Sequence, residues 1–352
     1  MTDLDDAAVL RAADPGDMLG TVVALADHAR EGYALGRAAT PLPSPDGIGS
    51  VVFCGMGGSA IAGDVVRVLA AERLHVPVVV VRSPELPAFA GPHALVVASS
   101  YSGDTAETLA LFEEALSRGC RQAVVTSGGE LERRAVEEGI AVVAVPGGFM
   151  PRAAFGYLTL GTVGALVEMG LLPGAGEDLD EALELMERMV AVSGPDVPAT
   201  VNPAKTLALR IGERTPVIWG AEGIGAVAAS RWKAAFNENA KVAAFASALP
   251  ELDHNEVVGW SPGQGVRSFL IALRHDGEQP DVAARFPLSI EIARSSGIQA
   301  EEIHAGGRSN LARLLELVQL GDLVSTYLGI ARGVDPSPIE AIARLKATLA
   351  EA

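Results

Sequence analysis

The stretch GSVVFCGMGGSA, residues 49–60, decides the fold class of this chain. Its valines, phenylalanine and cysteine predict a buried parallel strand, and the glycines that follow predict a tight turn into a helix over residues 60–74. The same order of strand, turn and helix continues along the chain. We predict further strands at residues 76–82, 94–99, 122–126 and 141–145, with helices near residues 105–118 and 131–138. Strands that alternate with helices in this way are typical of a doubly wound parallel sheet.

A second unit with the same pattern follows in the later half of the chain. A short apolar strand at residues 216–219 leads through the glycine-rich turn 220–225 into a helix over residues 226–240. Further strands are predicted at residues 268–274 and 300–304, with helices near residues 281–296 and 310–332. We therefore predict an α/β fold of two doubly wound parallel-sheet subdomains with extra N- and C-terminal helices.

Chain length and a break in the pattern predict the domain organisation. A chain of 352 residues is too long for one ordinary core and suggests two domains. The proline-rich run 41–45 separates the first helices from the first strand. We predict an N-terminal helical segment at residues 1–48, a first subdomain at 49–172, a helical linker at 173–213, a second subdomain at 214–334 and a C-terminal helix at 335–352.

The charge balance argues against one class of partner. The formal net charge is -17, whereas proteins that bind DNA or RNA carry clustered Lys and Arg to neutralise phosphates. We therefore expect no nucleic-acid partner. An acidic protein that binds an anionic metabolite needs a local site made of backbone amides, hydroxyl groups and a few cations.

Cysteine content and hydropathy predict the compartment. Cys54 and Cys120 are too few for a disulfide framework and match no zinc spacing, so we expect a cytoplasmic location and no metal. The first residues, MTDLDD, are acidic and unlike an export signal. Residues 153–172 are apolar enough to suggest a membrane span, but Glu168 and four glycines interrupt them. We expect a helix buried within or between subunits, and no membrane.

The turn at residues 53–60 has a glycine pattern that admits a nucleotide. Gly55, Gly57 and Ala60 can be read as a dinucleotide-binding fingerprint. Such a site usually has an acidic residue after the second strand, where this chain has Arg82, and arginine would suit NADP. This turn alone therefore does not exclude a nucleotide.

The turn after the third strand, SSYSGDT at residues 99–105, favours a different ligand. Hydroxyl groups at Ser100, Ser102 and Thr105, with the free amides of a helix N-terminus, form a nest suited to a compact phosphate monoester. Ser and Thr before a helix are also common N-caps, so one such turn by itself would indicate capping. Two such turns at the carboxyl ends of strands in one sheet favour phosphate binding, with Asp104 pointing away from the anion.

Residues 238–255 gather carboxylate, amide, ammonium and imidazole groups. Glu238 ends a helix of apolar and small residues, so partial desolvation is expected to raise the pKa of its carboxyl group and suit it to proton abstraction. A solvated helix end is the alternative. The carboxylates that flank His254, Asp253 and Glu256, are the rival bases.

Several short motifs follow one another along the chain. They are GMGGS at residues 55–59, SYSGDT at 100–105, PR at 151–152, NENAK at 237–241, HN at 254–255, DPSP at 335–338 and LK at 345–346. Together they resemble the bifunctional phosphoglucose/phosphomannose isomerases of the sugar isomerase (SIS) superfamily, from about residue 50 to the end. The chain departs from the family at Asp104, where the family usually has Asn, and in its longer N-terminal segment.

The resemblance implies a fold, an assembly and a type of chemistry. It implies two flavodoxin-like SIS subdomains with the active site between them, and a reaction that needs neither metal nor cofactor. It also implies a homodimer. The small residues of the helix predicted within residues 153–172 favour the same isologous assembly.

The resemblance further implies a role for each matched residue in converting fructose 6-phosphate to and from glucose 6-phosphate, mannose 6-phosphate or both. Glu238 would move the proton between C1 and C2 through a cis-enediol, and Arg152 would stabilise the charge on the enediol oxygens. His254, supplied across the dimer, would open the sugar ring, with Lys346 assisting. The phosphate would be held by Gly57, Gly58, Ser59, Ser100, Ser102 and Thr105. Such an enzyme would serve glycolysis, gluconeogenesis and mannose metabolism.

Three other functions of SIS folds can be weighed against the sequence. A sensor fused to a helix-turn-helix is disfavoured, because the region before residue 50 is short and acidic. An amidotransferase would need a nucleophilic cysteine at the mature N-terminus, where position 2 is Thr. A SIS-type sugar-phosphate-binding protein without turnover is the remaining alternative, and the joint presence of Glu238, Arg152 and His254 speaks against it.

Overall fold

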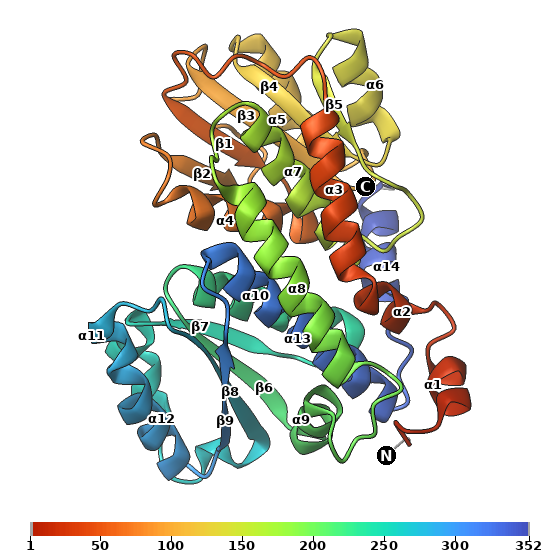
Figure 1. Cartoon of the computed structure of the whole chain (residues 1–352), viewed down its shortest axis with the longest axis vertical. Helices are drawn as coiled ribbons and strands as arrows, with labels where there is room; N and C mark the ends of the chain where they lie inside the picture. The colour runs from red at the N-terminus through yellow and green to blue at the C-terminus, as the bar shows by residue number, and fades with distance from the viewer. Residues whose placement is uncertain (1–2, 351–352) are drawn as a thin grey trace. The chain divides into compact units, whose positions relative to one another are not determined.

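The computed structural model describes residues 3–350, except the side chains of residues 346, 347, 349 and 350. Its elements are drawn in Figure 1. The chain divides into two compact units. Unit 1 is formed by Met1–Val23, Arg188–Gly306 and Glu316–Ala352, and unit 2 by Ala24–Glu187 and Gly307–Leu315. Helices α8 (Ala175–Ser193) and α13 (Asn310–Ala331) contain residues of both units.

Unit 2 contains a five-stranded parallel sheet of strand order β2-β1-β3-β4-β5. This order is the flavodoxin-like doubly wound arrangement. All strands are parallel, and β2 is added on one side of β1 whereas β3 to β5 are added on the other side. The strands are β1 (Ser50–Cys54), β2 (Val78–Val81), β3 (Ala94–Ser100), β4 (Arg121–Thr126) and β5 (Ala141–Ala144). The helices are α3 (Leu25–Ala38), α4 (Gly57–Ala70), α5 (Ala106–Ser117), α6 (Gly129–Glu137) and α7 (Phe155–Glu168).

Unit 1 contains a four-stranded parallel sheet of strand order β7-β6-β8-β9. Its strands are β6 (Thr215–Ala221), β7 (Phe245–Leu249), β8 (Ser268–His275) and β9 (Gln299–Ala305). Its α-helices are α1 (Ala7–Ala13), α2 (Met18–Val23), α9 (Pro203–Ile211), α10 (Ile224–Asn239), α11 (Pro280–Ala283), α12 (Arg285–Ser295) and α14 (Glu340–Ala350). Short 3-10 helices occupy η1 (Glu251–His254), η2 (Glu256–Gly259) and η3 (Gln264–Arg267). The two sheets confirm the predicted α/β fold, with α1 to α3 and α14 as the extra terminal helices.

Two details of unit 1 differ from the prediction. β7 was not predicted, because Phe245–Leu249 has no β-branched residue, and a strand at the sheet edge is only partly buried. The helix predicted over residues 281–296 is instead two helices, α11 and α12, joined at Ala284. Neither difference alters the parallel topology of the sheet.

The apolar stretch at residues 153–172 contains α7 (Phe155–Glu168), which is buried within unit 2. α7 lies beside α3 (Figure 1), and the two backbones touch where both helices carry glycine. A methyl group on Gly32 would lie 2.8 Å from Cα of Tyr157, and one on Gly156 would lie 3.0 Å from N of Ala29. These glycines therefore allow two helices of one chain to pack closely, and they do not support the prediction of a dimer.

One helix of the described residues is long and apolar enough to cross a membrane. It is α13, whose most apolar window has a mean hydropathy of 1.3 and is 94% buried. A buried core helix of this length has the same composition as a membrane span.

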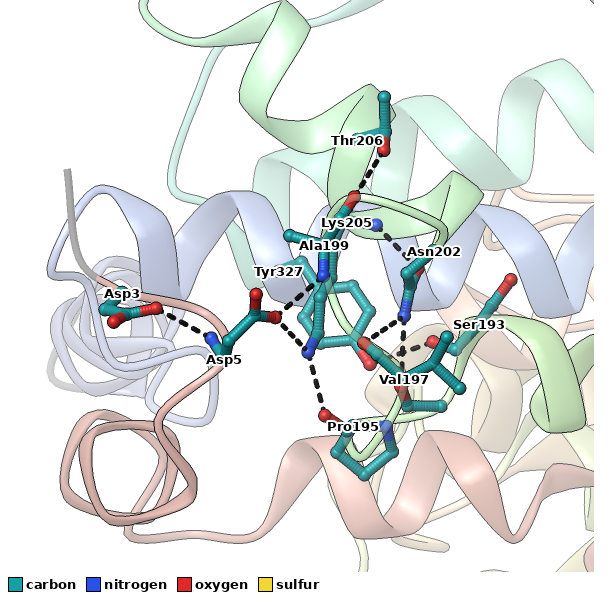
Figure 2. A network of polar contacts seen from close by, with 11 residues as sticks. Asp3, Asp5, Ser193, Pro195, Val197, Ala199, Asn202, Lys205, Thr206 and Tyr327 are labelled. Atoms are coloured by element: carbon teal, nitrogen blue, oxygen red, sulfur yellow. Dashed lines mark hydrogen bonds and ion pairs between the residues drawn. The ribbon is translucent and has the colours of Figure 1, made fainter.

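The N-terminal segment of unit 1 is tied to α9 by a buried ammonium group (Figure 2). Nζ of Lys205 donates to Oδ1 of Asp5 at 3.1 Å and to the carbonyl oxygen of Pro195 at 2.8 Å. The same nitrogen lies 5.7 Å from the ring centroid of Tyr327. Asn202 caps α9 by accepting the backbone N–H of Lys205 at 2.9 Å. The fully buried cation thus has a counterion, a carbonyl oxygen and an aromatic face.

In unit 1 the helices α10 and α13 meet through polar contacts. Arg231 donates to Asp322 at 2.7 Å, and both side chains are only 4% exposed. Nδ2 of Asn239 donates to Oγ of Ser325 at 3.0 Å, and the indole of Trp232 donates to the backbone of α13. These contacts fix the carboxyl end of α10, because Asn239 is its last residue.

We predict that Asp322→Ala destabilises the fold by about 3 to 5 kcal/mol, because it removes the carboxylate partner of the buried Arg231 guanidinium. Urea denaturation followed by circular dichroism measures the loss. Glu301→Ala is the matched control, since it breaks a more exposed ion pair with Arg210 in the same unit. That control should cost less than about 1 kcal/mol. Equal losses in the two variants would contradict the prediction.

Candidate active site

The two predicted phosphate turns lie side by side in unit 2. They follow β1 and β3, which are neighbours in the sheet, so both turns stand at the same edge. A hydrogen bond joins them, because Oγ of the buried Ser59 accepts the backbone N–H of Tyr101 at 3.2 Å. The topology therefore brings hydroxyl groups from two segments to one place.

The glycines of the first turn permit close contact between backbones. A methyl group on Gly55 would lie 2.9 Å from the carbonyl oxygen of Ser99, and one on Gly58 would lie 3.1 Å from the carbonyl oxygen of Pro151. Gly57 has a φ of +51°, a left-handed conformation that favours glycine. This turn opens α4, and no side chain caps the helix there. The first amides of α4 are thus available to an anion.

Two hydroxyl groups of the second turn, those of Ser100 and Thr105, bond to each other, and Oγ of Ser102 accepts the N–H of Asp104 at 3.3 Å. Oγ of Ser100 lies 2.9 Å from Oγ1 of Thr105 and accepts the N–H of Gly103 at 3.1 Å. Thr105 holds the N-cap position of α5, yet its side chain makes no capping hydrogen bond. Ser102 is exposed. The capping alternative therefore does not explain these hydroxyls.

Asp104 is held by a backbone amide. Its Oδ1 accepts the N–H of Glu130, in the first turn of α6, at 3.0 Å. Positive partial charge at a helix N-terminus stabilises a carboxylate. Asp104 thus has a backbone amide partner at the start of α6, and its orientation away from a bound phosphate stays a prediction.

Arg152 belongs to the turn that precedes α7. It is 2% exposed, and its Cα would lie 3.4 Å from a methyl group placed on Gly58. Its backbone thus lies against the first turn of α4, which carries Gly57, Gly58 and Ser59. The predicted cation and the phosphate turns share one region of unit 2.

Glu238 lies in the last turn of α10, in unit 1, and is half-buried. The helix it ends is largely buried, as the sequence predicted. Lys241 has a φ of +54°, and its Nζ donates to the backbone oxygen of Glu238 at 2.5 Å and to that of Pro336 at 2.9 Å. A pocket of about 510 Å³ opens beside this helix end, lined by Asn237, Glu238, Lys241, Val242, Ala243 and Ile339 to Ile342. Glu238 therefore lines a concave surface.

His254 is exposed at the end of η1, and its neighbouring carboxylates have other partners. Oδ1 of Asp253 accepts the hydroxyl of Ser289 at 2.6 Å, and its Oδ2 lies 3.2 Å from Arg285. Oε1 of Glu256 accepts the indole N–H of Trp219 at 2.8 Å. Both rival carboxylates thus serve structural contacts within unit 1.

The structure groups the candidate residues by unit. Those of unit 2 are Gly57, Gly58, Ser59, Ser100, Ser102, Thr105 and Arg152, and those of unit 1 are Glu238, His254 and Lys346. Lys346 lies in α14, but its side chain is outside the described residues. No cluster of three or more His, Cys, Asp or Glu side chains suited to a metal occurs in the described part of the chain.

Sequence reasoning assigned no role to Lys241 or Tyr101, although both lie within the quoted motifs. The left-handed φ of Lys241 cannot be seen in the sequence, since such a conformation is uncommon for residues other than glycine. Tyr101 bonds to residues far away along the chain, and only the tertiary structure shows them. The position of each residue inside a quoted motif was the one feature of the sequence that could have indicated a role for it.

Comparisons with known proteins identify the family of this chain. The family model described as bacterial phospho-glucose isomerase C-terminal SIS domain matches residues 200–349. A bifunctional phosphoglucose/phosphomannose isomerase of Caldicellulosiruptor bescii is 35% identical over 336 residues, which are 95% of this chain and 99% of that protein. One of Aquifex aeolicus is 37% identical over 302 residues, which are 85% of this chain and 90% of that protein.

A solved structure shares the fold. It is that of a hypothetical protein from Thermus thermophilus, with a TM-score of 0.74 and 18% identity, covering 98% of this chain and 93% of that chain. At this identity the likeness concerns the fold alone. The identities to the two sequence relatives extend over most of both chains, and they show that this chain belongs to the bifunctional phosphoglucose/phosphomannose isomerase family.

Proposed function

We propose that this chain interconverts fructose 6-phosphate with glucose 6-phosphate, mannose 6-phosphate or both, without a metal or an organic cofactor. The observation that carries the proposal is family membership over nearly the whole chain. The paired hydroxyl-bearing turns of unit 2 add the local chemistry that a phosphate monoester needs. A binding protein without turnover is the alternative, and relatives that are named as isomerases make it the weaker one.

The substrate phosphate binds the two turns of unit 2 in this proposal. The exposed Ser102 and the amides of Gly57 and Gly58 at the start of α4 offer donors, while Ser59, Ser100 and Thr105 shape the turns. Helix N-terminal amides suit an anion. A complex with fructose 6-phosphate that shows the phosphate elsewhere would overturn this assignment.

Glu238 acts as the base. It takes the proton from C2 of the open-chain aldose, the C1–C2 double bond forms, and the C1 carbonyl oxygen gains a proton to give the cis-enediol. Return of the proton to C1, with loss of the proton on O2, yields the ketose. Arg152 stabilises negative charge on the enediol oxygens, and Lys346 assists. The engagement of Asp253 and Glu256 elsewhere supports Glu238 over its rivals.

His254 exchanges a proton with the ring oxygen to open the sugar ring, as a general acid–base group. In this proposal it acts in the active site of the other protomer of a homodimer. Its exposure at the end of η1 is compatible with that placement. The resemblance to the family is the support for the assembly.

The proposed place of this enzyme is the cytoplasm, in glycolysis, gluconeogenesis and mannose metabolism. Both cysteines are free, as is usual in a reducing compartment. The acidic net charge favours neither a nucleic acid nor an anionic membrane surface as partner.

We predict turnover of fructose 6-phosphate by the purified chain in chelator-treated buffer. Two separate enzyme-coupled assays measure glucose 6-phosphate and mannose 6-phosphate as products, and their ratio gives the preference. Binding of fructose 6-phosphate without either product would favour the binding-protein alternative and overturn the proposed function.

We predict that Glu238→Gln lowers kcat by about 10²- to 10⁴-fold, or about 3 to 5 kcal/mol, with KM nearly unchanged, because shape is kept and the base is lost. Exchange of the C2 hydrogen with deuterated solvent, followed by NMR, should vanish in the same variant. Retention of more than about a tenth of the wild-type kcat would refute the assignment. Asp253→Asn is the control for a neighbouring carboxylate and should lose less activity than Glu238→Gln.

We predict that two inactive variants, Glu238→Gln and His254→Ala, recover activity when mixed as heterodimers. If His254 crosses the interface, one of the two sites in such a heterodimer has both native groups, and about half of the wild-type activity per dimer returns. Co-expression with two affinity tags isolates the heterodimer. No recovery, or a monomer in sedimentation, would contradict the crossed arrangement.

A further inference from the structure

Tyr101 connects four of the turns at one edge of the sheet in unit 2. It lies in the turn after β3 and is 7% exposed. Its backbone N–H donates to Ser59 in the turn after β1. Its carbonyl oxygen accepts the N–H of Ser127, after β4, at 3.0 Å and the hydroxyl of the same residue at 2.6 Å. Its phenol reaches the segment after β5.

The phenol of Tyr101 spans a pair of glycines. Oη donates to the carbonyl oxygen of Pro146 at 3.0 Å and accepts the N–H of Phe149 at 2.9 Å. Gly147 and Gly148 stand between these two partners, both are exposed, and Gly148 has a φ of +92°. A pair of exposed glycines has wide backbone freedom, so the two hydrogen bonds restrict an otherwise loose segment.

The restrained segment leads directly to Arg152. The carbonyl oxygen of Met150 accepts the N–H of Ala153 at 2.8 Å, which forms the turn that contains Arg152. On one side, Phe149 packs its ring against His28 and Tyr157, with centroids 5.0 and 5.6 Å apart. On the other side, the Pro151 and Arg152 backbone lies against Gly58. The phenol of Tyr101 is thus a polar restraint on both sides of the two glycines.

We propose that the Tyr101 hydroxyl is a positioning group for Arg152, which sets the place of its guanidinium relative to the reacting carbons. The inference rests on the proposed function, in which Arg152 stabilises the enediol oxygens. Tyr101 itself touches no reacting atom.

The backbone and the phenol of Tyr101 have separable effects. Its backbone groups hold Ser59 and Ser127, and a change of side chain leaves those groups in place. Of the groups of Tyr101 named above, the phenol is the one that bonds to the segment from Pro146 to Phe149. Loss of the hydroxyl alone should therefore leave phosphate binding intact and disturb the step that depends on Arg152.

The test is Tyr101→Phe, which removes one oxygen and keeps the buried ring. We predict that kcat falls about 10-fold, or about 1.4 kcal/mol, while KM for fructose 6-phosphate stays within about twofold. In an Arg152→Ala background the same change should alter kcat less than about twofold, because the group that it positions is absent. Unchanged kcat in Tyr101→Phe, or an equal loss with and without Arg152, would overturn the inference.

Tyr157→Phe is the matched control. It also removes one phenolic oxygen of unit 2, which donates to Oε2 of Glu31 at 2.8 Å, and it keeps the ring that packs against Phe149. We expect its kcat to stay near that of the wild type. A loss equal to that of Tyr101→Phe would overturn the inference, because it would indicate a general effect of a lost phenol.

A readout that needs no turnover separates this inference from the proposed function. Hydrogen exchange followed by mass spectrometry should show faster exchange in peptides covering residues 146–154 of Tyr101→Phe, and not of Tyr157→Phe. An inactive wild-type chain would refute the proposed function. Unchanged exchange in this segment would refute the positioning role, whether or not the chain is active.

Discussion

The site in unit 2 depends on backbone contact at Gly55 and Gly58. A methyl group on Gly55 would lie 2.9 Å from the carbonyl oxygen of Ser99, so the backbone would have to shift, and one on Gly58 would lie 3.1 Å from that of Pro151, which is a tight contact. This contact lets the turn after β1 lie against β3 and against the segment that carries Arg152. Three segments far apart along the chain therefore meet at one edge of the sheet. Because Gly55 and Gly58 lack side chains, the amides and hydroxyls of the turns and the backbone of Arg152 can lie close together.

Unit 1 holds its candidate base by polar contacts as well as by close backbone packing. The carboxyl end of α10 is fixed by Asn239 and by the buried pair of Arg231 and Asp322. A methyl group on Gly329 of α13 would lie 2.6 Å from the carbonyl oxygen of Asn239, so the two backbones also meet there. A buried ion pair is weak evidence for stability but can specify how two helices align. The last turn of α10, which carries Glu238, follows from that alignment.

Local patterns predicted the two parallel sheets and the positions of the hydroxyl-bearing turns. Buried parallel strands are rich in β-branched residues. β7 was not predicted, because Phe245–Leu249 has none. We could predict that the two hydroxyl-bearing turns lie together, because the carboxyl ends of parallel strands meet at the same edge of a sheet. The rival carboxylates could not be ranked, because Asp253 meets Arg285 and Ser289, 32 and 36 residues away. The small residues of α7 could be recognised in the sequence, but their packing partner α3 could not be predicted.

The glycine contacts between α3 and α7 limit how this family member can change. A clash between two side chains can be relieved by rotation, whereas a side chain at Gly32 or Gly156 would meet backbone atoms that have no such freedom. Each helix therefore constrains the other at these two positions. Variation along this seam requires simultaneous change in both helices, so it should be among the slowest parts of the sequence to diverge and a poor place to seek engineered diversity.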